Sequence, residues 1–299
     1  MDLTTRLGPL ELRTPLVAAS GTVGSVVDFA PVGALGAYGA AVAKSVSGDP
    51  WAGRPEPRLA PAGAGMLNGV GIQNPGIDHW VDEVGPRLGQ AGVLVWGSAV
   101  GTRFEEYCRV AKGLEGAGVQ AVELNLSCPN LESGLMFALD PAAAREVVAA
   151  VRGSVQIPIG AKLSPNAADI VAVATACMEG GADWLVLTNT IWGAGFDVET
   201  GRPLLSGVVG GYSGAPLKPI AIRSVWEVRR ALPQAPILGC GGVRSGADVV
   251  EYLLAGAQAV GLGTVHFAEP RAGRRILAEL RAYCRRHRLT RVAELIGGP

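Results

Sequence analysis

The sequence predicts an α/β protein folded as a (β/α)8 TIM barrel, and three observations support this. Eight short, almost entirely apolar runs recur along the 299 residues, helix-like stretches separate several of them, and polar residues gather where the runs end. Strands buried on both faces are apolar along their whole length, and a barrel of this kind takes about 250 residues. We therefore expect a single domain, residues 1–299.

The predicted strands and helices alternate as this fold requires. The strands are residues 16–19, 41–44, 93–96, 121–125, 159–163, 184–188, 236–239 and 259–262. The helices are residues 102–117, 141–151, 167–180, 218–231 and 246–255. Two connections, about 45–81 and 190–219, are too long for plain turns. We expect them to be functional loops above the ends of the second and sixth strands.

The composition excludes several classes of protein. Lys plus Arg and Asp plus Glu are 26 each, so no basic surplus indicates nucleic acid. We see no secretory signal and no run of about 18 apolar residues that could span a membrane. No two cysteines form a CxxC pair, so we expect no disulfide framework, no metal site on this chain and a location in the reducing cytoplasm. The five are Cys108, Cys128, Cys177, Cys240 and Cys284.

Lysines and glycines mark the ends of predicted strands. Lys44 and Lys162 are two of only four lysines, and both end a strand. An ammonium is a compact charge that can approach one electronegative atom, so we interpret both as functional, although such a lysine can also simply reach solvent. Gly241-Gly242 and Gly263-Thr264 follow the last two strands. Bare backbone N–H groups at these glycines, near the start of a helix, can bind a phosphate. The alternative is that the glycines only form tight turns.

A cysteine and several asparagines complete the candidate chemistry. Cys128 lies in a polar loop after the fourth strand. A thiol there can become a thiolate base or nucleophile, or it can be a small buried side chain, and spacing alone does not decide. Asparagine offers a donor and an acceptor to a ring with C=O and N–H edges, although a single loop asparagine more often makes a turn. Four of them follow predicted strands or lie in the long loops: Asn68, Asn125, Asn130 and Asn189.

Four motifs occur together in one order along the chain. They are Asn68-Gly-Val-Gly-Ile-Gln-Asn-Pro-Gly76, Asn125-Leu-Ser-Cys-Pro-Asn130, Ala161-Lys-Leu-Ser-Pro-Asn166 and Gly210-Gly-Tyr-Ser-Gly214. With them the chain resembles class 1 dihydroorotate dehydrogenases, and most closely the class 1B catalytic subunit. The resemblance implies one bound FMN and the oxidation of (S)-dihydroorotate to orotate in pyrimidine (UMP) biosynthesis. It implies that Cys128 removes the C5 proton while the C6 hydride passes to N5 of FMN.

The resemblance also implies binding residues. The orotate-binding positions are Lys44, Asn68, Gly69, Val70, Gly71, Ile72, Asn125, Asn130, Asn189 and Thr190. The FMN-binding positions are Ser20, Lys44, Ser45, Ser98, Asn125, Lys162, Thr188, Gly214, Gly241, Gly242, Gly263 and Thr264. Two positions depart from the family pattern. Ser98 stands where the family often has Asn. Gly69 stands where the family often has Ser or Ala, and glycine at this position makes the loop after Asn68 more flexible.

The resemblance further implies a partner, and other functions stay open. Class 1B enzymes pass electrons to a separate subunit with FAD and a [2Fe–2S] cluster and then to NAD⁺, so we expect a heterotetramer built on a catalytic homodimer. Fumarate is another candidate acceptor. The alternatives are a dihydropyrimidine dehydrogenase-like flavoprotein, a tRNA dihydrouridine synthase, and a non-redox phosphate-binding barrel that is a lyase or a regulatory subunit. We interpret the arginine-rich residues 271–291 as a solvated amphipathic helix, with a subunit interface as the alternative.

Overall fold

Eight parallel strands close into a barrel, as predicted. The computed structural model describes residues 1–126 and 136–298. Around the barrel the strands follow the order β10, β13, β14, β3, β4, β7, β8, β9, and β9 pairs with β10 to close it. They are β3 (Leu16–Ala18), β4 (Ala40–Val42), β7 (Leu94–Ala99), β8 (Ala121–Asn125), β9 (Ile159–Lys162), β10 (Trp184–Leu187), β13 (Ile237–Cys240) and β14 (Ala259–Leu262). Each overlaps its predicted range.

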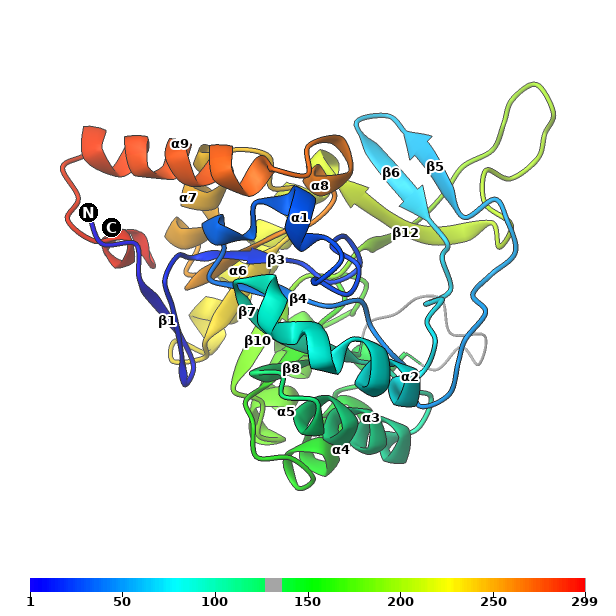
Figure 1. Cartoon of the computed structure of the whole chain (residues 1–299). Helices are drawn as coiled ribbons and strands as arrows, with labels where there is room; N and C mark the ends of the chain where they lie inside the picture. Colours follow the sequence, from blue (N-terminus) through cyan, green and yellow to red (C-terminus); the bar gives the residue numbers. More distant parts are fainter. Residues whose placement is uncertain (127–135, 299) are drawn as a thin grey trace.

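Helices surround the barrel (Figure 1). They are α1 (Ala30–Gly33), α2 (Ile77–Glu83), α3 (Phe104–Gly116), α4 (Pro141–Arg152), α5 (Ile170–Glu179), α6 (Lys218–Ala231), α7 (Gly246–Leu254), α8 (Val265–Ala268) and α9 (Ala272–Arg286). Short 3-10 turns are η1 (Leu35–Ala37), η2 (Gly85–Ala91), η3 (Phe137–Leu139), η4 (Ala215–Leu217) and η5 (Val292–Leu295). The five predicted helices correspond to α3 through α7. Asp140 and Asp169 cap α4 and α5 by accepting backbone N–H groups of the first turn.

A hairpin that the sequence analysis did not predict closes one end of the barrel. Strands β1 (Thr5–Leu7) and β2 (Leu10–Leu12) pair antiparallel. Leu7 and Leu12 belong to one buried cluster with Trp96 and Trp184, which lie on barrel strands. The two indole rings have centroids 5.0 Å apart. The hairpin and the two tryptophans therefore form an apolar floor near the beginning of the strands.

The two long connections form a second sheet. Strands β5 (Leu59–Ala62), β6 (Gly65–Asn68), β11 (Ile191–Ala194) and β12 (Val209–Gly214) make an antiparallel sheet in the order β11, β12, β6, β5. We call it the arm sheet. The pairing of β6 with β12 joins the two connections, from Gly65↔Gly214 to Asn68↔Gly211. Figure 1 shows the arm sheet at the end of the barrel opposite the β1–β2 hairpin.

The arginine-rich C-terminal region forms helix α9, in agreement with the prediction of an amphipathic helix. Its buried face includes Ile276, Leu280 and Cys284, while Arg285 and Arg286 are exposed in its last turn. The segment after α9 returns to the N-terminus, where Asp2 and Arg291 form a parallel bridge. Within the described ranges, no helix combines the length and apolar character needed to cross a lipid bilayer.

Candidate active site

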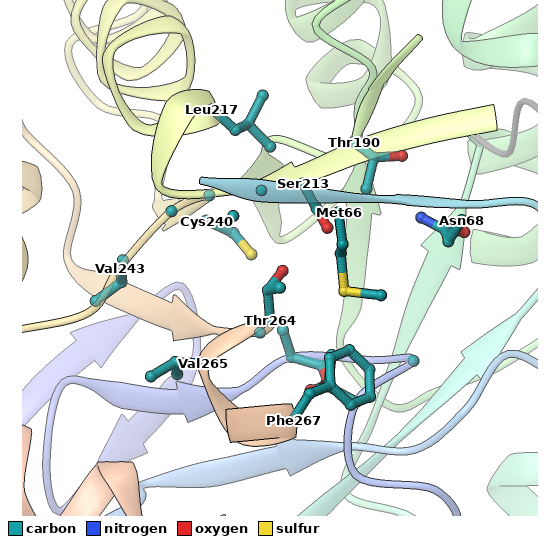
Figure 2. Close-up of a pocket in the computed structure, with 18 of the residues that line it drawn as sticks. Met66, Asn68, Thr190, Ser213, Leu217, Cys240, Val243, Thr264, Val265 and Phe267 are labelled. Atoms are coloured by element: carbon teal, nitrogen blue, oxygen red, sulfur yellow. The ribbon is translucent and has the colours of Figure 1, made fainter. Parts of the chain in front are cut away.

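A cavity of about 1110 Å³ lies where the barrel strands end, beside the arm sheet. Its walls include residues at or just after the ends of β3, β4, β8, β9, β10, β13 and β14. The carboxyl ends of the strands are where TIM barrels bind their ligands. In Figure 2, Met66 and Ser213 of the arm sheet lie on one side of the cavity, and Thr264 and Phe267 lie on the other. A cavity of this size can enclose a cofactor together with a small substrate.

Most of the site residues predicted from the sequence line this single cavity. They are Ser20, Lys44, Ser45, Asn68, Val70, Ile72, Asn125, Lys162, Thr188, Asn189, Thr190, Gly214, Gly241, Gly242, Gly263 and Thr264. These residues come from nine separate stretches of the chain, which the barrel and the arm sheet bring together. The predicted substrate-binding and cofactor-binding positions therefore share one cavity.

Three of the predicted residues that the structure describes do not line the cavity. Gly69 and Gly71 lie in the loop after β6 between residues that do, and Gly71 has a φ of +70°, which favours glycine. Ser98 is buried on β7 behind the cavity wall. Cys128 and Asn130 lie outside the described residues, so their roles stay predictions.

A row of hydrogen-bonded polar side chains runs along the wall from β7 to β10. The hydroxyl groups of Ser98 and Ser45 lie 2.8 Å apart, and Asn125 Nδ2 donates to Ser45 Oγ at 3.1 Å. Asn189 Nδ2 in turn donates to Asn125 Oδ1 at 3.3 Å. The backbone carbonyl of Asn125 accepts the Tyr107 hydroxyl at 2.9 Å, which holds the end of β8 to helix α3. These hydrogen bonds fix the orientation of both amides at the cavity wall.

A buried ion pair supplies charge at the bottom of the cavity. Lys162 Nζ lies 3.3 Å from Glu123 Oε1, and their side chains are 8% and 2% exposed. Burial lowers the pKa of Lys162, but attraction to the Glu123 carboxylate outweighs it and leaves that pKa above its ordinary value. Burial raises the pKa of the Cys240 thiol despite the nearby ammonium. Lys162 is therefore a cation at neutral pH, held at the cavity wall.

The glycine turns after β13 and β14 present backbone donors to the cavity. The N–H groups of Gly241, Gly242 and Gly263 donate no hydrogen bond to any described residue. Gly242 has a φ of +70°, and a Cβ added there would lie 2.8 Å from the backbone nitrogen of Lys218. Glycine is thus required for this turn, and its donors suit an anionic group such as a phosphate.

Several cavity residues were not predicted as site residues. Glu123 is inside a strand, and its charged partner lies on the neighbouring strand, so only the register of the barrel reveals the pair. Cys240 ends β13 and lines the cavity. Met66 and Ser213 belong to arm-sheet strands, and Phe267 follows the glycine turn after β14. No group of three or more metal-ligating side chains occurs among the described residues.

Comparison with known proteins gives the family. The model of the dihydroorotate dehydrogenase family matches residues 2–283. The "Dihydroorotate dehydrogenase B (NAD(+)), catalytic subunit" of Geobacter sp. (strain M21) is 42% identical over 298 residues, which cover 99% of this chain and 97% of the relative. The protein of the same name from Alkaliphilus metalliredigens (strain QYMF) is 39% identical over 298 residues, with 99% and 98% covered.

A solved structure supports the fold. The crystal structure of DHODH in complex with ferulenol from Eimeria tenella superposes with a TM-score of 0.83 at 21% identity, covering 99% of this chain and 88% of that one. The resemblance inferred from the four sequence motifs is confirmed by the match to the family model over most of the chain. The chain therefore belongs to the dihydroorotate dehydrogenase family, and its similarity to the B-type catalytic subunits extends over nearly its whole length.

Proposed function

We propose that this protein oxidises (S)-dihydroorotate to orotate with FMN bound in the cavity, as a step of pyrimidine (UMP) biosynthesis. The observation that carries the proposal is the buried cation Lys162 in the same cavity as asparagines from three segments of the chain. A hydride acceptor that becomes negative is stabilised by a cation held beside it. Asn68, Asn125 and Asn189 offer the donors and acceptors that a planar ring with C=O and N–H groups needs.

The residues of the cavity fit FMN. The N–H groups of Gly241, Gly242 and Gly263, which have no acceptor in the described chain, would bind its phosphate. Lys162 would lie beside the part of the flavin ring that gains negative charge. The further proposed FMN contacts are Ser20, Lys44, Ser45, Asn125, Thr188, Gly214 and Thr264.

The residues of the chain have separate roles in the reaction. Dihydroorotate must lose a proton from C5 and a hydride from C6, and FMN, when bound, supplies the hydride acceptor. We assign the C5 proton to the thiolate of Cys128, which follows β8 closely in the sequence. The asparagines, with Asn130 as a further proposed member, would hold the substrate ring so that C6 faces the flavin. The arm sheet would limit the access of water to the cavity.

We also propose a partner and a final electron acceptor. The names of the relatives contain the terms "catalytic subunit" and "NAD(+)". By extension, this chain would pass electrons to a second subunit that carries FAD and a [2Fe–2S] cluster, and from there to NAD⁺. The assembly would be a heterotetramer built on a catalytic homodimer. The cytoplasmic location stays a prediction.

Anaerobic mixing of the purified yellow protein with dihydroorotate tests the activity. We expect the flavin absorbance to bleach with dihydroorotate and not with dihydrouracil. A protein that stays colourless after incubation with FMN would contradict the proposal and favour a non-redox barrel. Bleaching by dihydrouracil instead would assign the protein to dihydropyrimidine oxidation.

Two cysteine variants test the proposed base. Cys128→Ala should keep FMN and lose bleaching by dihydroorotate at neutral pH, because no other base is assigned to the C5 proton. Cys108→Ala is the matched control, since Cys108 lies on α3 and is not among the cavity residues. Normal bleaching in Cys128→Ala would remove Cys128 from the mechanism.

A further inference from the structure

The buried pair of Glu123 and Lys162 is placed by three neighbouring barrel strands. Glu123 on β8 and Trp184 on β10 are both in register with Gly160 on β9, so the three residues form one row across the barrel. Lys162 lies two residues further along β9, at the end of the strand. Its ammonium is nevertheless only 3.3 Å from the Glu123 carboxylate. The lysine side chain therefore reaches toward the row below it.

Lys162 is the group that compensates the burial of Glu123. Oε1 of Glu123 is buried and receives no hydrogen bond from any residue of the described chain. A buried carboxylate without a partner is strongly unfavourable, and so is a buried ammonium. Because each of these two charges lies in contact with the other, the pair is buried with little net charge. Removal of either partner would leave the other uncompensated.

The floor below the pair is apolar and closely packed. A Cβ placed on Gly160 would lie 2.2 Å from Cε2 and 2.5 Å from Nε1 of Trp184, so the indole ring occupies the space above that glycine. Trp184 and its neighbour Trp96 are 0% exposed. The pair is thus bounded by rings on the floor side and by the cavity on the other. A ligand that fills the cavity would leave Glu123 as the principal counter-charge of Lys162.

We propose that Glu123 is a positioning residue that keeps Lys162 protonated and in place beside the flavin. This inference rests on the proposed function, because it takes FMN as the occupant of the cavity. Without Glu123, the ammonium would be buried against a ligand and an apolar floor, and loss of its proton would be favoured. Glu123 would then control the charge that the flavin meets, although Glu123 itself does not take part in the chemistry.

Sulfite binding to the oxidised flavin reads out this charge without turnover. Sulfite adds to oxidised flavins and leaves negative charge on the ring, so its affinity rises with a cation nearby. We expect Glu123→Gln to weaken sulfite binding by about 10- to 100-fold, as Lys162→Met does, because both variants lose the cation. Glu179→Gln, an exposed change of the same kind on α5, is the control and should bind sulfite like the unmodified protein.

The direction of the change in sulfite affinity of Glu123→Gln decides whether Glu123 keeps Lys162 protonated. If Lys162 kept its proton without Glu123, removal of the carboxylate would make the site more positive, and sulfite would bind more tightly. Tighter or unchanged sulfite binding in Glu123→Gln would therefore overturn the proposal. Glu123→Asp, which keeps the carboxylate, is expected to retain most of the affinity that Glu123→Gln loses.

Thermal unfolding provides a second test that does not depend on catalysis. Each single variant leaves one buried ionisable group without its partner, and keeping that group charged or neutralising it costs stability, whereas Glu123→Gln/Lys162→Met removes both groups. We expect the double variant to melt about 5–10 °C above Glu123→Gln, both with excess FMN and after FMN removal. If the loss of melting temperature in the double variant were the sum of the two single losses, Glu123 and Lys162 would not be coupled. A protein that never binds FMN would refute the proposed function, while this cycle would still test the pair.

Discussion

The hydroxyl of Tyr38 lies 2.7 Å from Nε2 of His266, inside the protein beside the cavity wall. The other ring nitrogen, Nδ1, lies 2.9 Å from Oγ1 of Thr22, a residue that lines the cavity. Because the Thr22 hydroxyl donates its proton to the carbonyl of Ala19, it can only accept from Nδ1–H. Nε2 then accepts the proton of Tyr38. The neutral ring therefore satisfies both neighbours, and it links α8 to the loop after β3.

The first prediction is that His266 makes stability depend on pH. Burial lowers the pKa of His266 to about 4, against about 6.5 in an unfolded chain. Between these values the unfolded chain binds more protons, so the stability from the neutral ring is fully present above about pH 6.5 and is lost as pH falls toward 4. The total loss is about 3 kcal/mol at this one site.

Urea unfolding of His266→Phe checks this pH dependence. Phenylalanine cannot titrate, so the difference in unfolding free energy between the unmodified protein and the variant should shrink by about 3 kcal/mol from pH 7 to pH 4. A difference that stays constant over this range would show that His266 does not titrate as its surroundings indicate.

The second prediction concerns Ser98, which the sequence assigns to FMN. The structure places its hydroxyl on Ser45, and Ser45 accepts from Asn125, so Ser98 reaches the cavity only through other side chains. We expect Ser98→Ala to change FMN affinity less than about threefold and to raise KM for dihydroorotate by about fivefold, because loss of one hydrogen bond loosens the asparagine row. Steady-state kinetics and flavin titration separate the two effects. A large loss of FMN with unchanged KM would instead support direct contact with the flavin.

The barrel could be predicted from the sequence because its strands are apolar throughout, whereas the arm sheet could not. Residues 209–214 read Val-Gly-Gly-Tyr-Ser-Gly, and the three glycines resemble a loop. Glycine is nevertheless needed there, since a Cβ on Gly211 would lie 2.2 Å from Oγ1 of Thr190. Long-range pairing with β6, which no local pattern contains, makes this segment a strand.

Site residues could be predicted from the sequence where a residue type that is rare in this chain ends a predicted strand. Lys162 was identified because lysine is rare in this chain and ends a strand. Glu123 is equally unusual, as a carboxylate within an apolar strand, but its role depends on which side chain lies next to it on the neighbouring strand. That information lies in the register between β8 and β9, not in the spacing along the sequence.

The third prediction is that Asp248 supports the proposed phosphate turn. Its Oδ2 accepts the N–H groups of Arg244 and Ser245 at 2.8 Å each, and its Oδ1 lies 2.6 Å from Lys218 Nζ. Asp248→Asn should cost about 1–2 kcal/mol of stability and weaken FMN binding several-fold, because residues 244 and 245 lie two and three positions after the glycine turn. Asp169→Ala removes the N-terminal cap of α5, a helix that does not contribute to the cavity. This control should lose comparable stability and keep its FMN affinity, and equal loss of FMN in both variants would contradict a local role for Asp248.

The fourth prediction uses two glycines whose surroundings are opposite. Gly116 ends helix α3, and a Cβ there would meet nothing within 4 Å, whereas a Cβ on Gly160 would overlap the Trp184 ring. Gly116→Ala should therefore stabilise the protein by about 0.4–1 kcal/mol, because alanine reduces the freedom of the unfolded chain. Gly160→Ala should destabilise it by about 1–3 kcal/mol or more, because the indole cannot move away within the packed floor.

Gly160→Ala should also affect the site above it. Trp184 lies in the same row as Glu123, so displacement of the indole would disturb the packing beneath the ion pair with Lys162. Urea unfolding measures the stability of both glycine variants, and sulfite titration of the bound flavin measures the charge at the site. Weaker sulfite binding is expected in Gly160→Ala and not in Gly116→Ala. If Gly160→Ala were as stable as the unmodified protein, the space above residue 160 would have to be open, and the apolar floor described for the barrel would be incorrect.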